Sequence, residues 1–148
     1  MSPEAYTEYL HRHIPLTAAM QLRVLHSGAG RIELLAPLAP NLNHRGTAFG
    51  GSLVTLGIAS GWALLQRGLA EAGVEARIVV QKSECEYLLP VEQEFVASST
   101  LPEEWPQFLD TLRKRGRARI TVHSSLRSAG QEVVRHSGVF VAIAGPDQ

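Results

Sequence analysis

The chain has 148 residues, and its 14 lysines and arginines balance 14 aspartates and glutamates, so the formal charge is zero at pH 7. This length predicts one domain, 1–148, whose core needs neither a metal nor a disulfide, and the neutral balance argues against a general nucleic-acid or membrane binder. The single cysteine, Cys85, excludes an internal disulfide and, with the polar N-terminal stretch, favours a reducing compartment such as the cytoplasm.

Helix and strand signals alternate along the whole chain. Ser2-Pro3-Glu4 is typical of a helix start, because serine caps helices and proline fits the first helical position. The expected elements in chain order are a helix that ends at Pro15, strands at 20–27 and 31–38, a long helix at 50–72, strands at 77–89 and 93–100, a short helix within 102–115, and strands at 118–126 and 132–144. Short turns between the later strands favour antiparallel pairing.

The helix predicted at 50–72 dominates this pattern. Residues 46–65 carry no charge over about the length of a membrane span. Five glycines in this stretch and the lack of a second span argue against a membrane location, and a helix that is apolar on all sides is also typical of a buried core. An antiparallel sheet has to cover one face with apolar side chains. The sequence therefore predicts an α+β fold, with a curved antiparallel sheet wrapped around one long central helix.

The usual catalytic sets are missing from the sequence. The six histidines are scattered and there is no Cys-x-x-Cys pair, so no metal site is expected. A Ser-His-Asp triad lacks a suitable acid, since the only aspartates are Asp110 and Asp147, and neither Ser52 nor Ser60 lies in a Gly-x-Ser-x-Gly elbow. Phosphate-binding loops of the Walker and dinucleotide types are also absent.

The stretch NHRGTAFGGS, residues 43–52, precedes the apolar helix. Gly50 and Gly51 place bare backbone N–H groups at the helix start, where the helix dipole favours a carbonyl oxygen or an oxyanion. Asn43 and Thr47 are expected to add side-chain hydrogen bonds to such a ligand. The alternative is that both side chains only satisfy backbone groups of a tight turn.

This stretch resembles the hot-dog fold of acyl-thioester enzymes. The resemblance is carried by Asn43, Gly46-Thr47-x-Phe49-Gly50-Gly51, the apolar helix and Ser83-x-x-x-Tyr87-x-x-Pro90, and its order of elements fits nearly the whole chain. It implies a sheet that wraps the central helix, a homodimer or dimer of dimers paired edge to edge, and an active site at the dimer interface. It also implies that a thioester carbonyl binds at the Gly50 and Gly51 amides.

The chain departs from this family at two positions. Common hot-dog thioesterases have His-Gly-Gly where this chain has Phe49-Gly50-Gly51, and an acid seven residues after the second glycine, where this chain has Ile58. The helix has no carboxylate until Glu71, about 30 Å from Gly51 at ~1.5 Å per residue. Hydrolysis needs a group that activates water or attacks the carbonyl. A glutamate at position 84 or 86 would supply a base if it pointed into the site, although alternation along a strand sends both to one face.

A closer resemblance is to the hot-dog family described as "putative thioesterase", which includes malonyl-acyl-carrier-protein decarboxylases. It is carried by the string Asn-x-x-Gly-Thr-x-Phe-Gly-Gly-Ser-Leu that begins at Asn43. The resemblance implies decarboxylation of malonyl-acyl carrier protein, which supplies acetyl primers for fatty-acid synthesis, on a substrate carried by phosphopantetheine or coenzyme A and with no other cofactor. That reaction needs an oxyanion site but neither a base nor a nucleophile. Hydrolysis by a thioesterase, and thioester binding without turnover, are the alternatives.

Further substrate contacts are expected around the helix start. The candidates are His44, Phe49, Ser52, Ile58, Trp62, Ser83, Arg115 and Arg117. Three of them, at positions 49, 58 and 62, suit an apolar pocket for the malonyl carboxylate, with core packing as their alternative role. The two arginines belong to a run of five cations within residues 113–119, which is expected to steer an acidic acyl carrier protein or the phosphates of coenzyme A.

Overall fold

The computed structural model of the chain describes residues 1–146, so Asp147 and the last residue of the predicted 1–148 domain lie outside it. Four helices and six strands follow one another with a short 3-10 turn between the second strand and the long helix. They are α1 (Pro3–His13), α2 (Pro15–Ala19), β1 (Arg23–Gly28), β2 (Arg31–Ala36), η1 (Ala39–Asn41), α3 (Gly50–Glu71), β3 (Ala76–Tyr87), β4 (Phe95–Thr100), α4 (Trp105–Arg115), β5 (Arg117–Ser128) and β6 (Gln131–Ala144).

The local signals in the sequence explain most of these boundaries. Ser2 caps α1 through a hydrogen bond from the Ala5 N–H to its side chain. Pro15 was expected only to end the first helix, but it also begins α2, because proline at a first helical position lacks only an N–H that would be free anyway. Gly73 follows the end of α3 with a φ of 70°, a left-handed conformation that glycine adopts without strain.

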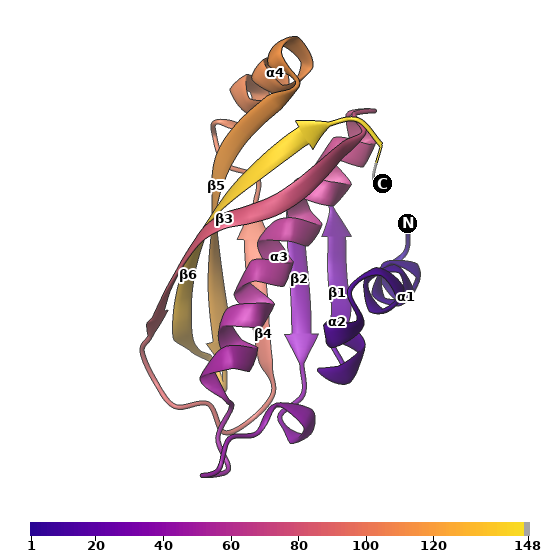
Figure 1. Cartoon of the computed structure of the whole chain (residues 1–148). Helices are drawn as coiled ribbons and strands as arrows, with labels where there is room; N and C mark the ends of the chain where they lie inside the picture. The colour runs from indigo at the N-terminus through magenta and orange to yellow at the C-terminus, as the bar shows by residue number, and fades with distance from the viewer. Residues whose placement is uncertain (147–148) are drawn as a thin grey trace.

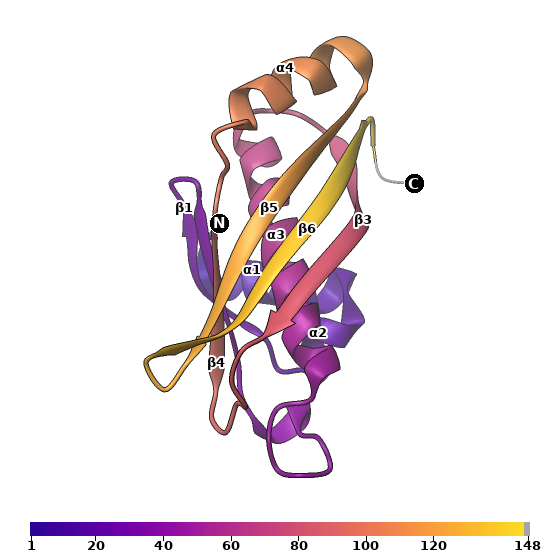
Figure 2. The ribbon, with the colours of Figure 1, turned by 90° about the vertical axis from the view of Figure 1, so that its left-hand side faces the viewer.

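The six strands form one antiparallel sheet in the order β1-β2-β4-β5-β6-β3. The sheet curves around α3, which lies across its inner face (Figure 1). Seen from the side, β5, β6 and β3 pass over α3, while α4 lies at the end of the molecule opposite the start of α3 (Figure 2). This is the predicted α+β arrangement of a hot-dog fold, a curved antiparallel sheet around a long central helix.

One neighbour relation differs from the chain order. The later strands pair antiparallel, as their short turns predict, but β3 pairs with β6 rather than with β4, and β4 lies between β2 and β5. The connection from β3 to β4 passes the start of α3, where the Val91 carbonyl accepts a hydrogen bond of 2.8 Å from the Ala48 N–H. β3 thus lies at one edge of the sheet, and its last residue, Tyr87, contacts Gly50 at the N-terminal end of α3.

Glycines allow α3 to lie close to the sheet. A Cβ on Gly57 would come within 2.7 Å of the His136 ring, and a Cβ on Gly61 within 2.7 Å of the Phe140 ring. The Gly57-x-x-x-Gly61 pattern, which also occurs in membrane helices, therefore serves helix-to-sheet packing here. None of the helices within residues 1–146 combines the length and the hydropathy that a membrane crossing requires.

A buried hydroxyl cluster lies between α3 and the sheet. Ser60, Ser99 and Ser124 form a closed triangle with Oγ–Oγ distances of 3.1, 2.8 and 2.6 Å. Ser60 is fully buried and also donates to the Gly57 carbonyl. Because the three hydroxyls satisfy one another, Ser60 has no access to a substrate and serves the core.

Candidate active site

Asn43 organises the loop that leads into α3. Its Oδ1 accepts hydrogen bonds from the N–H groups of Arg45 (2.8 Å) and Thr47 (3.2 Å), and its Nδ2 donates to Thr47 Oγ1 at 2.7 Å. The Asn43 N–H also donates to the Thr47 carbonyl at 2.8 Å. The structure thus has both side chains in the turn-stabilising role that the sequence left open. Donation by Asn43 or Thr47 to a substrate stays a prediction. Thr47 Oγ1 accepts the bond from Asn43, so its own O–H is still available to donate.

The base of the same loop is fixed by Asn41, a residue just outside the stretch 43–52 that the sequence singled out. Its buried Nδ2 donates to the carbonyls of Met20 (3.1 Å) and Pro37 (2.7 Å). Its own carbonyl accepts the Phe49 N–H at 2.7 Å. Asn41 therefore ties the residue that immediately precedes α3 to the body of the fold, and so fixes where the helix begins.

The first two N–H groups of α3 are free. The N–H groups of Ser52 and Leu53 bond to the Phe49 carbonyl at 2.9 and 3.2 Å, and Phe49 supplies no side-chain cap. Within residues 1–146, the N–H groups of Gly50 and Gly51 have no hydrogen-bond acceptor. Unsatisfied donors at the positive end of a 22-residue helix attract a carbonyl oxygen or an oxyanion. Gly50 also lines a pocket of about 320 Å³ with Leu53 and residues 87–91.

Each glycine has a different neighbour. A Cβ on Gly51 would lie 2.3 Å from the ring of Phe49, which is 56% exposed, so a side chain at this position would require that ring to move. A Cβ on Gly50 would meet Tyr87 at 3.5 Å, an ordinary contact. The Tyr87 hydroxyl donates to the Gly50 carbonyl at 3.1 Å. Phe49 thus lies beside Gly51, and Tyr87 lies beside Gly50.

Alternation along β3 decides which of its side chains reach α3. Ser83 contacts the inward-facing His136 and Tyr87 contacts Gly50, so these residues lie on the α3 side of the strand. Glu84 instead pairs with Lys82 at 2.9 Å on the surface. Glu86 lines an outer-face pocket with Arg31, His123 and Arg135 among its other residues. Neither glutamate points to the free amides, so the strand supplies no carboxylate there.

His136 on β6 is a residue that the sequence analysis set aside as one of several scattered histidines. It is only 2% exposed, and its Nε2 lies 2.7 Å from Ser83 Oγ. Its Nδ1 is buried without a hydrogen-bond partner among residues 1–146. Burial lowers the pKa of His136, which favours the neutral imidazole. The signal in the sequence was its alternation with the apolar residues Val134 and Phe140, which places it on the buried face of the strand.

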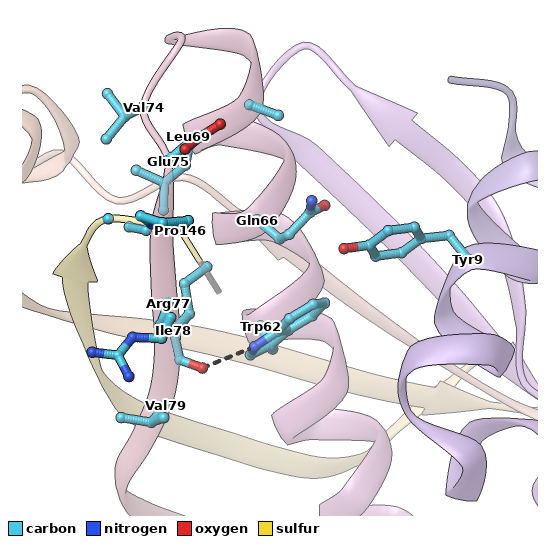
Figure 3. A pocket seen from close by; sticks show the side chains of 13 residues that line it. Tyr9, Trp62, Gln66, Leu69, Val74, Glu75, Arg77, Ile78, Val79 and Pro146 are labelled. Carbon is cyan, nitrogen blue, oxygen red and sulfur yellow. Dashed lines mark hydrogen bonds between the residues drawn. The ribbon is translucent and has the colours of Figure 1, made fainter. Parts of the chain in front are cut away.

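The remaining candidates are distributed over the molecule. Ser52 and Ile58 are half-buried on α3, and His44 is exposed in the loop. Trp62 lies eleven residues after Gly51, about 16 Å along the helix. It donates its Nε1–H to the Ile78 carbonyl at 3.1 Å and lines a separate pocket of about 410 Å³ with Tyr9 and Gln66 (Figure 3). Phe49 and Trp62 therefore do not share one pocket within a subunit.

The basic residues lie at the far end of the molecule. Arg113 donates to the Ala72 carbonyl just past the end of α3, at 3.0 Å, and Arg115 ends α4 (Figure 1). Arg117 begins β5 as an exposed residue. The start of α3 is about 33 Å away along a helix of 22 residues. One subunit therefore does not bring Arg115 or Arg117 to the Gly50 and Gly51 amides.

The part of the chain that the structure describes has no group of three or more histidine, cysteine, aspartate or glutamate side chains placed to hold a metal ion. What the start of α3 presents is a set of neutral donors. The free amides of Gly50 and Gly51 lie beside the Phe49 and Tyr87 rings, with Ser83 farther along β3. Such a site can stabilise negative charge on an oxygen through hydrogen bonds, and none of these five residues has a charged side chain.

The family model described as "Putative thioesterase (yiiD_Cterm)" matches residues 4–144. Three solved structures are similar over 95–97% of this chain and 96–98% of their own. They are a protein of unknown function from Chlorobaculum tepidum TLS (24% identity, TM-score 0.90), a "putative thioesterase" from Shewanella oneidensis (26%, 0.87), and a "probable thioesterase" from Pseudomonas aeruginosa (22%, 0.84). No protein with a curated description matches the chain.

Proposed function

We propose, from the premise that this chain belongs to the hot-dog family described as "Putative thioesterase (yiiD_Cterm)", that it decarboxylates malonyl-acyl carrier protein to acetyl-acyl carrier protein. The family is thioesterase-like, so an acyl thioester is the expected substrate class. The observation that carries the proposal is the pair of free N–H groups on Gly50 and Gly51, in a site without a carboxylate.

Decarboxylation places negative charge on the thioester oxygen, the atom that these amides are proposed to bind. The bond between the carboxylate carbon and the α-carbon breaks, CO₂ leaves, and the electron pair becomes an enolate on the thioester oxygen. Protonation of the α-carbon by water then gives the acetyl group. One preorganised oxyanion donor is typically worth about 3–4 kcal/mol of barrier, and the site offers two amides that need no reorganisation. Thr47 would add its O–H as a donor, which its bond from Asn43 leaves free, and Asn43 would add an N–H of its side-chain amide.

The apolar character of the helix supports decarboxylation over hydrolysis. Ile58 occupies the position where related hydrolases carry an acid, and Glu84 and Glu86 face away from α3. A hydrolase would have to activate water without them. Weak solvation of the malonyl carboxylate beside Phe49 and Ile58 would also favour its departure as neutral CO₂.

Hydrolysis is the second candidate, and two observations favour it. The family and the Shewanella oneidensis and Pseudomonas aeruginosa structures are described as thioesterases. In addition, Ser83 and His136 are hydrogen-bonded at 2.7 Å, as a nucleophile and its base would be. In this alternative, His136 would take the Ser83 proton as the hydroxyl attacks the thioester carbonyl, the carrier would leave as a thiol with that proton, and water would then hydrolyse the ester on Ser83.

A homodimer formed through β3 is part of the proposal. This edge strand has 12 residues of which one is buried, and both Val79 and Val80 are exposed. Antiparallel pairing with a second β3 would turn the partner end for end, which would bring the α4 end of one subunit level with the α3 start of the other. Arg115 and Arg117 of that subunit would then attract an acidic carrier protein, or coenzyme A, in the cytoplasm.

The deciding experiment is incubation of the protein with malonyl-acyl carrier protein, followed by mass spectrometry of the intact carrier. Loss of 44 Da, the mass of CO₂, with the thioester retained is the expected result. Release of free malonate and the unacylated carrier would overturn the decarboxylase and favour the thioesterase. Malonyl-coenzyme A, used in parallel, identifies the preferred carrier. Binding of either substrate without turnover would leave only a thioester-binding module.

A further inference from the structure

Ser83 and the buried His136 form a hydrogen-bonded pair beside α3 that the decarboxylation chemistry does not use. His136 is 2% exposed, Ser83 Oγ lies 2.7 Å from its Nε2, and the Nδ1 has no partner among residues 1–146. The ring packs against Gly57 and Gly138, where an added Cβ would come within 2.7 and 3.2 Å of it. Gly57 thus leaves room for the His136 ring, whereas an added Cβ on Gly138 would meet the Phe140 ring first, at 2.6 Å.

The surroundings of the ring determine which nitrogen carries the proton. An N–H on Nδ1 would be a buried donor without an acceptor, and such orphaned donors are rare in folded proteins. An unprotonated Nδ1 would be a buried acceptor without a donor, which is less rare in folded proteins than a buried donor without an acceptor. The proton therefore belongs on Nε2, which donates to Ser83 Oγ. Because that bond occupies a lone pair of Oγ, the Ser83 O–H remains free to donate to a further group, and Ser83 has no other partner in the described chain.

The spacing along α3 between the free amides and Gly57, which contacts the His136 ring, suits a malonyl group. Gly57, which touches the His136 ring, lies six residues after Gly51, about 9 Å along the helix. A thioester oxygen held about 3 Å from the amides, a malonyl group of roughly 4 Å, and an O–H···O bond of about 2.7 Å together span a similar length. The free carboxylate would then reach the Ser83 hydroxyl.

We propose that Ser83 is the hydrogen-bond donor that recognises the free carboxylate of the malonyl thioester, and that His136 is the positioning residue that turns its hydroxyl outward. The inference rests on the proposed decarboxylation and names how that site selects a malonyl over an acetyl group. A neutral donor orients the carboxylate without the strong stabilisation that an arginine would give, so the carboxylate remains ready to leave. With the proton assigned to Nε2, His136 is not a base for Ser83, so this proposal and the nucleophile role of Ser83 are alternatives that the test separates.

The test compares Ser83→Ala, His136→Gln and His136→Leu with the wild-type protein. The Gln side chain can donate an N–H to Ser83 but cannot act as a base, whereas Leu removes the donor. With malonyl carrier protein, Ser83→Ala and His136→Leu are expected to raise KM about 10-fold, in line with the loss of one hydrogen bond to a charged group. His136→Gln is expected to stay within about threefold of wild type and to keep its pH profile above pH 7. Inhibition by acetyl carrier protein, the product, should be equal in all four proteins.

Other outcomes would overturn the inference in distinguishable ways. If His136→Gln abolishes turnover and the wild type accumulates a malonyl ester on Ser83, seen by peptide mass spectrometry, the pair is a nucleophile with its base. If Ser83→Ala weakens malonyl and acetyl groups equally, Ser83 does not recognise the carboxylate. Because Ser83 is exposed on an edge strand, its alanine variant should fold even if both His136 variants do not. Absence of decarboxylation by the wild-type protein would instead remove the proposed function itself.

Discussion

Gly50 has room for a methyl group in the folded chain, and this separates its structural role from its proposed chemical one. The nearest atoms to an added Cβ belong to Tyr87, at 3.5 Å. Gly50→Ala should therefore leave the melting temperature unchanged or slightly raised, because alanine favours a helix. If a thioester oxygen binds beside this residue, the methyl group should displace it and lower kcat/KM by at least about 10-fold. Unchanged turnover in the alanine variant would remove Gly50 from the site.

The buried imidazole of His136 predicts a pH dependence of stability. Its pKa is lowered by burial from the usual 6.5. Above that pH both the folded and the unfolded chain hold a neutral ring, so the residue contributes nothing to the dependence. As the pH falls below about 6.5, the unfolded chain binds a proton that the folded chain does not, so the free energy of unfolding falls until the lowered pKa is reached.

The measurement is the melting temperature of wild type and His136→Gln at pH 7.5 and pH 5.5. The wild type is expected to lose more stability on acidification than the variant, which has no group to titrate at this position. Equal losses in the two proteins would show that the imidazole titrates alike in the folded and unfolded chains. The difference between the two losses in melting temperature isolates the contribution of His136, because the other titrating groups are the same in both proteins.

The site residues differ in how far the sequence revealed them. Gly50 and Gly51 were predictable as free donors, because consecutive glycines before an apolar run indicate an open helix start. His136 was not, because its contact with Ser83 depends on β3 pairing with β6, which the chain order does not disclose. Asn43 had two roles consistent with its place in the loop, and only the hydrogen bonds of the loop show which one the free chain adopts.

At the scale of elements, α3 depends on small residues where it crosses the sheet. A Cβ on Gly61 would lie 2.7 Å from the Phe140 ring. Gly61→Val should force that ring aside and lower the free energy of unfolding by about 1–3 kcal/mol, as overpacking of cores typically does. Ala70→Val, at an exposed position of the same helix, is the control and should cost only about 0.5 kcal/mol through helix propensity. Chemical denaturation of both variants measures the difference, and equal losses would contradict close packing at Gly61.

The elements themselves were largely predictable, whereas their arrangement was only partly so. Caps, glycines and periodicity placed α1, α3 and α4 to within a few residues, because those signals act locally. The position of β3 at the sheet edge depends on the long-range path of the segment 88–94 around the start of α3, and on the packing of β4 between β2 and β5. No local sequence signal encodes which strands become neighbours in the sheet. The correct fold followed from the need of one sheet to cover one apolar helix.

At the scale of the whole molecule, β3 is the feature that points beyond a single chain. A 12-residue edge strand with exposed valines has unpaired backbone groups that invite another strand. The other edge, β1, has six residues and packs beside α1 (Figure 1). If two chains pair through β3, a lysine in that strand should oppose association, because the two-fold axis brings the two added charges near each other.

Val80 and Leu25 provide a matched pair for this test, since they are 41% and 40% exposed on the two opposite edge strands. Val80→Lys is expected to convert a dimer into a monomer at micromolar concentration, while Leu25→Lys leaves the dimer intact, as measured by light scattering with size-exclusion chromatography. Monomeric Val80→Lys should also lose turnover of malonyl carrier protein, because the proposed site would be open to water on its β3 side. A monomeric wild type, or a variant that remains dimeric, would place the interface elsewhere. Full activity in a monomer would show that one chain holds the complete site, and that the carrier needs no arginine from a second subunit.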